Sequence, residues 1–450
     1  MIGSSRLLMD LSKLAKRAKT DGISVCAHAQ TRLVFRFAYG AIHQDLVQES
    51  VRVTVKVIQR QRVGIASTDT LEPTSLTRCV RAAADIATHA PDQDGLPELP
   101  RGYRLTTSRD YVEGTARVEP GACVALLKGL FQLCQGAGAK LAGSLVTGED
   151  EFSVVNSSGV ACYAASTTAG AKLVTMYRAL SGYASGVARS LDRLGLEGLL
   201  KTSLSQSLHR EEPAMIPLGA YEVILEPEAV AELVTWLGYT AFGAKSVEER
   251  TSCLAGRMGE RLFGAQITIT DDGNEPMSLR IPFDFEGTPK QRVALIDRGK
   301  ATGIVYDATY GKRFGHPSTG HGMPPDDVEG PIPLHLVMAP GEAPVSEMIR
   351  ACKRGLLIPR FHYVNGLLNP REALMTGLTR EGCFLIEDGQ VTQPVRTMRF
   401  TQSLLEAFKR VRGVSKERRL VAEPSQELGC AVVPTLHLDR FTFTGRSEQP

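Results

Sequence analysis

The hydrophobic positions after residue 220 form the clearest pattern in the chain. Residues 221–225 (YEVIL) are rich in apolar and β-branched side chains and predict a strand. Pro227 suits the first turn of a helix, where a missing N–H has no cost. Apolar residues then follow at the i, i+3, i+4, i+7 spacing of one helical face: Val230, Leu233, Val234 and Leu237. We therefore expect a strand that runs into an amphipathic helix with one face in the core.

Similar patterns predict the elements of the first half. Valines and polar residues alternate over 51–57 (VRVTVKV), which predicts a strand with one buried and one solvated face. A turn at 156–159 (NSSG) predicts a hairpin. Other strands are expected at 23–27, 33–37, 62–67, 140–147, 152–156, 160–165 and 172–180, and helices at 7–18, 73–88, 119–135 and 188–208.

The second half is richer in predicted strands. They are expected at 266–270, 293–296, 303–305, 334–338, 383–387 and 390–395, with helices at 247–262 and 345–353 and a loop over 316–330. Asp388-Gly389 is a strong hairpin signal. Pro213 and Pro217 mark the best boundary. We predict an α+β protein with a mixed α/β domain at 1–215 and a strand-rich domain at 216–450.

Composition changes this picture little. A chain of 450 residues has room for two or three domains, and its weak net charge of +3 argues neither for nor against nucleic acid. The nine cysteines form no CxxC pair, which is typical of a reducing compartment. No signal-peptide core and no run of about 18 apolar residues occurs. We expect a cytoplasmic protein without a membrane segment.

Most motif candidates favour an ordinary structural interpretation. The segment 238–246 (GYTAFGAKS) resembles a phosphate-binding loop, but Ala244 is an insertion and the segment follows a helix, so a helix end and turn is favoured. The basic run 409–419 lacks interleaved aromatic residues, which favours a solvated helix end and loop over a nucleic-acid site.

Two histidines, His316 and His321, flank Gly320 in a glycine-rich loop. No Cys, Asp or Glu stands at ligand spacing within that loop, so the histidines are better interpreted as substrate-binding or solvent-facing than as metal ligands.

The second half resembles the TldD/PmbA (TldE) family, whose members are related to zinc peptidases. The segments that carry the resemblance occur in family order over about half of the chain: 281–307, 318–322, 340–349, 385–395 and 434–445. The first half is similar more loosely, through 53–69 and the alanine-rich helix that follows. The resemblance implies the family's α+β fold.

In the catalytic branch of that family the core helix carries HExxxH, in which two histidines bind zinc and the glutamate activates water. The matching residues here are 227–232, with Pro227 and Glu232 in place of the histidines and Glu228 retained. A zinc site needs about three protein ligands, which this motif does not supply. Cys430 lies where that branch has a further cysteine, and we interpret it as a buried thiol.

The resemblance therefore implies the PmbA/TldE side of the family. The expected role is a peptide-binding subunit without metal or other cofactor, paired with an HExxxH-bearing homologue that holds zinc, or with itself. The peptide would pair with an exposed strand edge in a cavity lined by residues 314–323 and the hairpin 383–395.

Two alternatives stay open. One is an autonomous metallopeptidase in which Glu228, Glu232 and either His316 or His321 hold a metal. The other is a binding or assembly protein with no part in proteolysis.

Overall fold

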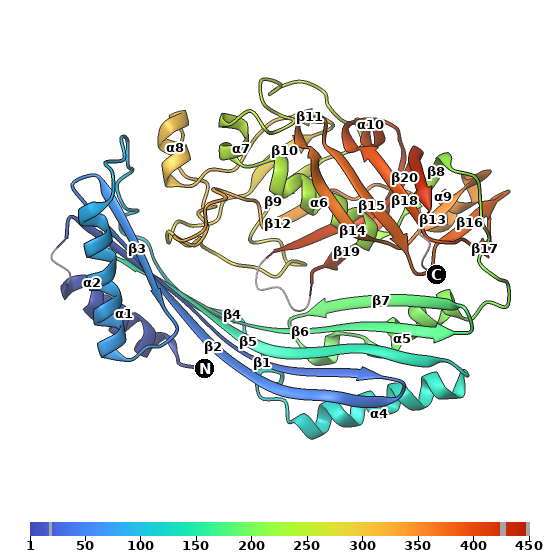
Figure 1. Ribbon diagram of the computed structural model, residues 1–450, viewed down its shortest axis with the longest axis horizontal. Coiled ribbons are helices and arrows are strands. Elements are labelled where there is room, and N and C mark those ends of the chain that lie inside the picture. Colours follow the sequence, from blue (N-terminus) through green and yellow to red (C-terminus); the bar gives the residue numbers. More distant parts are fainter. Residues whose placement is uncertain (18–19, 424–428, 447–450) are drawn as a thin grey trace.

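The computed structural model describes residues 1–17, 20–423 and 429–446, and their strands form two sheets (Figure 1). The first is seven-stranded, in the order β3-β2-β1-β5-β6-β4 with β7 also paired to β6. Its strands are β1 Gly22–Ala38, β2 Ala41–Gln59, β3 Arg62–Thr68, β4 Arg104–Asp110, β5 Lys140–Asn156, β6 Ala161–Tyr177 and β7 Leu180–Ala188. The α+β prediction is confirmed.

Helices cover one face of this sheet and the second half of the chain covers the other (Figure 1). Val25 packs with α1 and α2, whereas its neighbour Cys26 packs with Phe283 of the second half. The helices are α1 Ser4–Arg17, α2 Pro73–His89, α3 Glu113–Ala116, α4 Pro120–Gly136 and α5 Leu196–Ser207, with a 3₁₀ turn η1 Leu191–Arg193. The solvated face predicted for 51–57 is thus partly covered, since Thr54 is buried.

Long strands replace several pairs of short ones. The breaks expected near 28–32, 148–151 and 166–171 are wrong, because β1, β5 and β6 run through them in continuous register. Their polar middle residues are paired inside the sheet: Asp150 accepts two bonds from the guanidinium of Arg32, at 2.7 and 2.8 Å. The helix predicted at 188–208 is limited to α5, because β7 extends to Ala188.

The second sheet contains thirteen strands around one long central strand. β20 Cys430–Arg446 pairs parallel with β12 and antiparallel with β8, β18 and β19. The other strands are β8 Gly219–Leu225, β9 Ile269–Asp271, β10 Val293–Asp297, β11 Lys300–Ala301, β12 His335–Met338, β13 Arg354–Ile358, β14 Arg360–Asn369, β15 Leu374–Arg380, β16 Phe384–Glu387, β17 Gln390–Pro394, β18 Met398–Ser403 and β19 Val411–Val421. The change of sheet falls between α5 and β8, around the predicted boundary near residue 215.

Helix α6 Pro227–Ala241 packs against this sheet, and its predicted inward residues are fully buried. The remaining helices are short: α7 Ala244–Glu248, α8 Ala308–Phe314, α9 Val345–Ala351, α10 Leu404–Lys409 and a 3₁₀ turn η2 Pro370–Glu372. The hairpin predicted at Asp388-Gly389 is confirmed, with both residues at positive φ. The loop predicted at 316–330 is also confirmed.

Three predictions in this half are wrong. The strand expected at 303–305 does not form, because β10 pairs with β11 at Lys300–Ala301 and only Val305 makes a single bridge, to Gly243. The helix expected at 247–262 ends at Glu248, because Arg250 turns at φ 57° and the N–H groups of Thr251 and Ser252 bond back to Ser246. The basic run expected to be a helix end and loop is largely the strand β19, because β20 pairs with it on both sides of an irregularity at 415–417.

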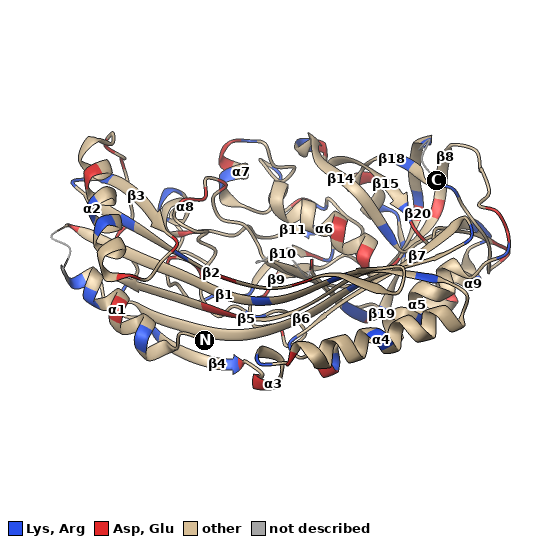
Figure 2. Ribbon diagram, turned by 60° about the horizontal axis from the view of Figure 1, so that its bottom comes forward, with Lys and Arg blue, Asp and Glu red and all other residues tan. Residues whose placement is uncertain are grey.

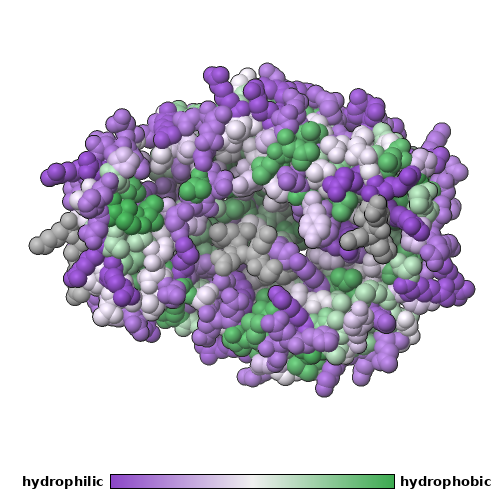
Figure 3. Space-filling model, viewed as in Figure 1, coloured by the Kyte–Doolittle hydropathy of each residue, from purple (hydrophilic) through white to green (hydrophobic). Residues whose placement is uncertain are grey.

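The surface carries charges of both signs, interspersed over both sheets and their helices (Figure 2). On the face shown in Figure 3, hydrophobic residues form separate small patches among hydrophilic ones. All nine cysteines are free and buried. Within the described ranges, no helix combines the length and apolar character that a membrane crossing requires.

Candidate functional site

The N-terminal end of α6 is held in place by the strand that precedes it and by the end of β13. Glu226 has the extended backbone of a helix cap, and Pro227 occupies the first turn as expected. The N–H of Glu226 donates to the carbonyl of Ile358 (3.0 Å), and that of Ala229 donates to Pro359 (3.1 Å). One of the otherwise unpaired N–H groups of the helix start therefore has a backbone partner.

Glu228, the retained glutamate, connects the two sheets. Its Oε1 accepts a bond from the hydroxyl of Ser185 on β7 (2.9 Å) and another from the Ser185 N–H (3.3 Å). The same oxygen accepts from the guanidinium of Arg419 on β19 (2.8 Å). The Glu228 side chain is 11% exposed and that of Arg419 41%. Glu228 of α6 is thus hydrogen-bonded to β7 through Ser185 and forms an ion pair with β19 through Arg419.

Burial raises the pKa of all three glutamates at this helix start. For Glu226 and Glu228 the positive charge of Arg419 opposes the rise. For Glu232 a hydrogen bond with Trp236 opposes it. Grouping three carboxylates in a partly desolvated place favours proton uptake or a nearby cation.

Cations and an aromatic ring surround these carboxylates. The Arg360 guanidinium stacks over the ring of Tyr183 at 3.9 Å and donates to Glu381 at 2.7 Å. Lys172 of β6 forms an ion pair with Glu423. Burial raises the pKa of Tyr183 to about 12. The region between β7 and α6 is therefore lined by paired charges from both sheets.

These residues do not fit a zinc site. Pro227 has no ligand atom, and Glu228 already accepts bonds from Arg419 and Ser185. Among residues with described positions, no three-ligand cluster of His, Cys, Asp and Glu includes Glu228, Glu232, His316 or His321. The metal set of the autonomous-peptidase alternative is therefore not assembled in this arrangement.

Cys430 starts β20, opposite His335 in the register of β12 and β20. The thiol is buried, as expected, and burial raises its pKa to about 12.

The loop residues take different environments. His316 is exposed and stacks on Tyr306, with ring centroids 5.3 Å apart. His321 is 1% exposed and is hydrogen-bonded to Asp271 (3.2 Å). Gly320 has φ +75°, and a Cβ there would lie 2.3 Å from the carbonyl oxygen of Pro289. Of the three, only His316 offers its side chain at the surface.

The expected cavity lining of 314–323 together with the hairpin 383–395 is not brought together within this chain. The hairpin β16–β17 ends one side of the second sheet, whereas β9, which holds Asp271 beside His321, lies toward the other (Figure 1).

His321 belongs to a buried charged network that sequence reasoning missed. Burial alone would raise the pKa of Asp271, but His321 and Lys290 hold it below its usual range. Burial also lowers the pKa of His335 to about 4 and lowers that of Lys290. The residues are far apart in sequence, and Asp271 stands next to Asp272 where a loop was expected, so no local pattern indicated the network.

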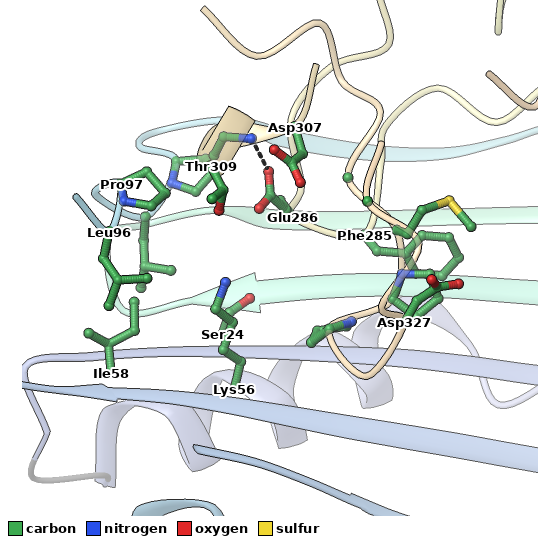
Figure 4. Close-up of a pocket in the computed structure, with 18 of the residues that line it drawn as sticks. Ser24, Lys56, Ile58, Leu96, Pro97, Phe285, Glu286, Asp307, Thr309 and Asp327 are labelled. Carbon is green, nitrogen blue, oxygen red and sulfur yellow. Dashed lines mark hydrogen bonds between the residues drawn. The ribbon is translucent and has the colours of Figure 1, made fainter. Parts of the chain in front are cut away.

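A cavity of about 160 Å³ lies nearby, between β2 and the second half (Figure 4). Lys56, Glu286 and Asp307 line it, and the N–H of Ala308 donates to Glu286 (2.9 Å). Burial and the neighbouring Asp284 raise the pKa of Glu286. Lys56 was predicted on the solvated face of its strand; it is half-buried and lines this cavity.

Comparison with known proteins decides the family. The sequence profile described as the PmbA/TldA metallopeptidase C-terminal domain matches residues 218–445, about half of the chain. The chain belongs to the PmbA/TldD family. A "Metalloprotease PmbA" of Escherichia coli O157:H7 is 22% identical over 437 residues, which cover 93% of this chain and 92% of that protein.

Several other curated relatives match over half of their own length or less. A "Metalloprotease TldD homolog" of Haemophilus influenzae is 27% identical over 209 residues, 44% of this chain and 42% of the relative. Among solved structures, TldE from Thermococcus kodakarensis has the same fold, with a TM-score of 0.86 at 21% identity, covering 97% of this chain and 100% of that one.

Proposed function

We propose that this PmbA/TldD-family chain is the peptide-binding subunit of a two-component peptidase and holds no catalytic metal at the start of α6. Its partner would be a family member with an intact HExxxH helix, which supplies the zinc and the hydrolytic chemistry. One observation carries the proposal: Glu228, the retained glutamate of the motif, is bound by Arg419 and Ser185. A carboxylate held this way is a structural ion pair and is not free to activate a water molecule.

The arrangement around α6 supports a binding role. β7 lies at the edge of the first sheet beyond β6, and it contacts β19 of the second. An extended peptide binds such an edge through main-chain hydrogen bonds. The ion pairs Arg419–Glu228 and Arg360–Glu381 would then lie beside the peptide next to that edge. Binding at a partner's interface requires no chemistry from this chain.

The test is reconstitution with an HExxxH homologue from the same genome. Each chain alone and the mixture are incubated with a fluorescently labelled unstructured peptide, with and without chelator. We expect hydrolysis only by the mixture, abolished by Glu→Gln in the partner's HExxxH. Glu228→Gln in this chain, which preserves shape and removes the charge, leaves the chemical step intact. Chelator-sensitive hydrolysis by the isolated chain that Glu228→Gln abolishes would contradict the proposal.

A further inference from the structure

A second set of polar side chains lies on the face of β8 that points away from α6. Val223 and Leu225 pack in the large core with α6, whereas Ile224 packs with Cys352 under α9. Because side chains alternate along a strand, Glu222 shares the face of Ile224. His437 lies opposite Ile224 on β20 and completes the set.

These three residues bring together a carboxylate, an imidazole and a thiol. His437 Nε2 lies 2.6 Å from Glu222 Oε1, and one ligand atom from each of Glu222, Cys352 and His437 lies within 4.8 Å of the others. Cys352 is fully buried, and the side chains of His437 and Glu222 are only 4% and 13% exposed. In the part of the chain that the structure describes, this is the one cluster of three such ligands.

The backbone around the cluster makes room for it. A Cβ on Gly355 would lie 2.5 Å from the Cys352 sulfur and 2.5 Å from the backbone oxygen of Glu222, so this position requires glycine. Cys352 follows α9 as its C-cap, and its N–H donates to the carbonyl of Ile349 (3.1 Å). The ligands thus stand on two paired strands and a capped helix end, which hold them in one geometry.

We propose that Glu222, Cys352 and His437 bind one zinc ion. Zinc binds Cys sulfur at about 2.3 Å and His nitrogen or carboxylate oxygen at about 2.0–2.2 Å. The three ligand atoms lie within 4.8 Å of one another, so small side-chain movements bring them to one shared ion. A thiolate with an imidazole selects zinc over magnesium or calcium. With three protein ligands, the fourth position is left for water or another donor.

Arg412 lies between the site and solvent, and zinc would displace its guanidinium from Glu222. Its guanidinium lies 3.3 Å from Glu222 and is 50% exposed. It also donates to Asp439 through Nε at 2.7 Å, so it keeps a carboxylate partner when zinc takes Glu222. Binding replaces the thiol proton of Cys352, which is released to water as the sulfur–zinc bond forms. Because the thiol must lose its proton to bind zinc, affinity increases with pH.

This site is independent of the proposed function. It lies on the other side of β8 from Glu228, and zinc here supplies no chemistry to α6. It fixes α9, β8 and β20 to one another, a structural role.

The experiment is metal titration of the full chain without a histidine tag. The protein is stripped with chelator and titrated with Co²⁺ and then with Zn²⁺, following thiolate-to-cobalt absorption and bound metal per chain. We expect one ion per chain, with affinity reduced about tenfold or more in Cys352→Ser and in His437→Gln. Cys383→Ser, another buried thiol, and Glu228→Gln are the matched controls and keep wild-type affinity.

Circular dichroism and thermal melting establish that each variant is folded. If Cys352→Ser does not fold, the affinity of His437→Gln tests the proposed site instead. Less than stoichiometric metal in the wild-type chain would overturn the site. So would wild-type affinity in folded His437→Gln. Loss of metal in Glu228→Gln would place the ion at α6 and contradict the proposed function as well.

Discussion

Strand β19 places an arginine beside each of two glutamates, and the two resulting sites differ in chemistry. Arg419 binds Glu228 at the start of α6, and Arg412 binds Glu222 on the opposite face of β8. Glu228 has a serine as its other partner, whereas Glu222 has an imidazole and a thiol within reach. The site at the start of α6 thus offers carboxylates without an imidazole or a thiol, whereas the site around Glu222 offers all three groups. Position in a fold does not determine chemistry; the neighbouring side chains do.

The largest effect is expected from Gly355→Ala, which disturbs the packing around Glu222 and Cys352. The new Cβ would overlap the Cys352 sulfur and the backbone of β8, so we expect a loss of about 1–3 kcal/mol in the free energy of unfolding. Gly413→Ala is the control, because its Cβ would meet Met348 at 3.4 Å and His437 at 3.7 Å. Urea unfolding compares the two variants, and equal losses would show that the space at Gly355 is not required.

A second prediction concerns a variant in which the site around Glu228 gains metal ligands like those around Glu222. Pro227→His with Glu232→His restores the motif, but Arg419 still neutralises Glu228 and repels a cation. We expect weak zinc binding in that variant and about tenfold or more tighter binding when Arg419→Ala is added. Co²⁺ titration in a Cys352→Ser background measures this, and Cys430→Ser then tests whether Cys430 is the third ligand. Unchanged affinity after Arg419→Ala would mean that the arginine does not control this site.

A third prediction concerns the strength of the Glu228 ion pair. Because the Arg419 side chain is 41% exposed, solvent screens the pair, and we expect a coupling of about 1 kcal/mol with Glu228. A double-mutant cycle of Glu228→Ala and Arg419→Ala in thermal melting measures it. A coupling near zero would mean that the contact with Ser185 alone orients Glu228.

The smallest effect is a pH dependence at Glu226. Burial raises its pKa in the folded protein above the unfolded value of about 4.3, so its protonated form favours folding at low pH and this contribution is lost as pH rises through the folded pKa. Glu226→Gln removes the charge. We expect the variant to match wild type at pH 3–4 and to be more stable by less than about 1 kcal/mol at pH 8. Melting temperatures over that range test it, and a gain only at low pH would have the wrong sign.

The sequence predicts the local part of this fold and misses what distant segments contribute. β8 and α6 were predictable because apolar spacing and Pro227 agree with each other. The middles of β1 and β5 lay outside the predicted strands, where Arg32 and Asp150 interrupt the apolar pattern, but each neutralises the other across the sheet. The basic run became β19 because of β20, which no local pattern reveals.

The same limit applies to the candidate sites. The missing histidines at Pro227 and Glu232 were visible from the motif alone. Arg419 was seen only as part of a basic run, because its partner Glu228 lies 191 residues away. Cys352 and His437 were not singled out, since their proximity to Glu222 depends on the order of β8, β13 and β20.

The central position of β20 in the second sheet affects how the chain folds during translation. The first sheet is complete once Ala188 has emerged, so it can fold while synthesis continues. β8, β12, β18 and β19 must all wait for β20, which is translated after every one of them. Pairing over such long separations is slow and leaves strand edges exposed. Until β20 is translated, the strands of the second half have exposed edges, and the chain is then most prone to aggregation.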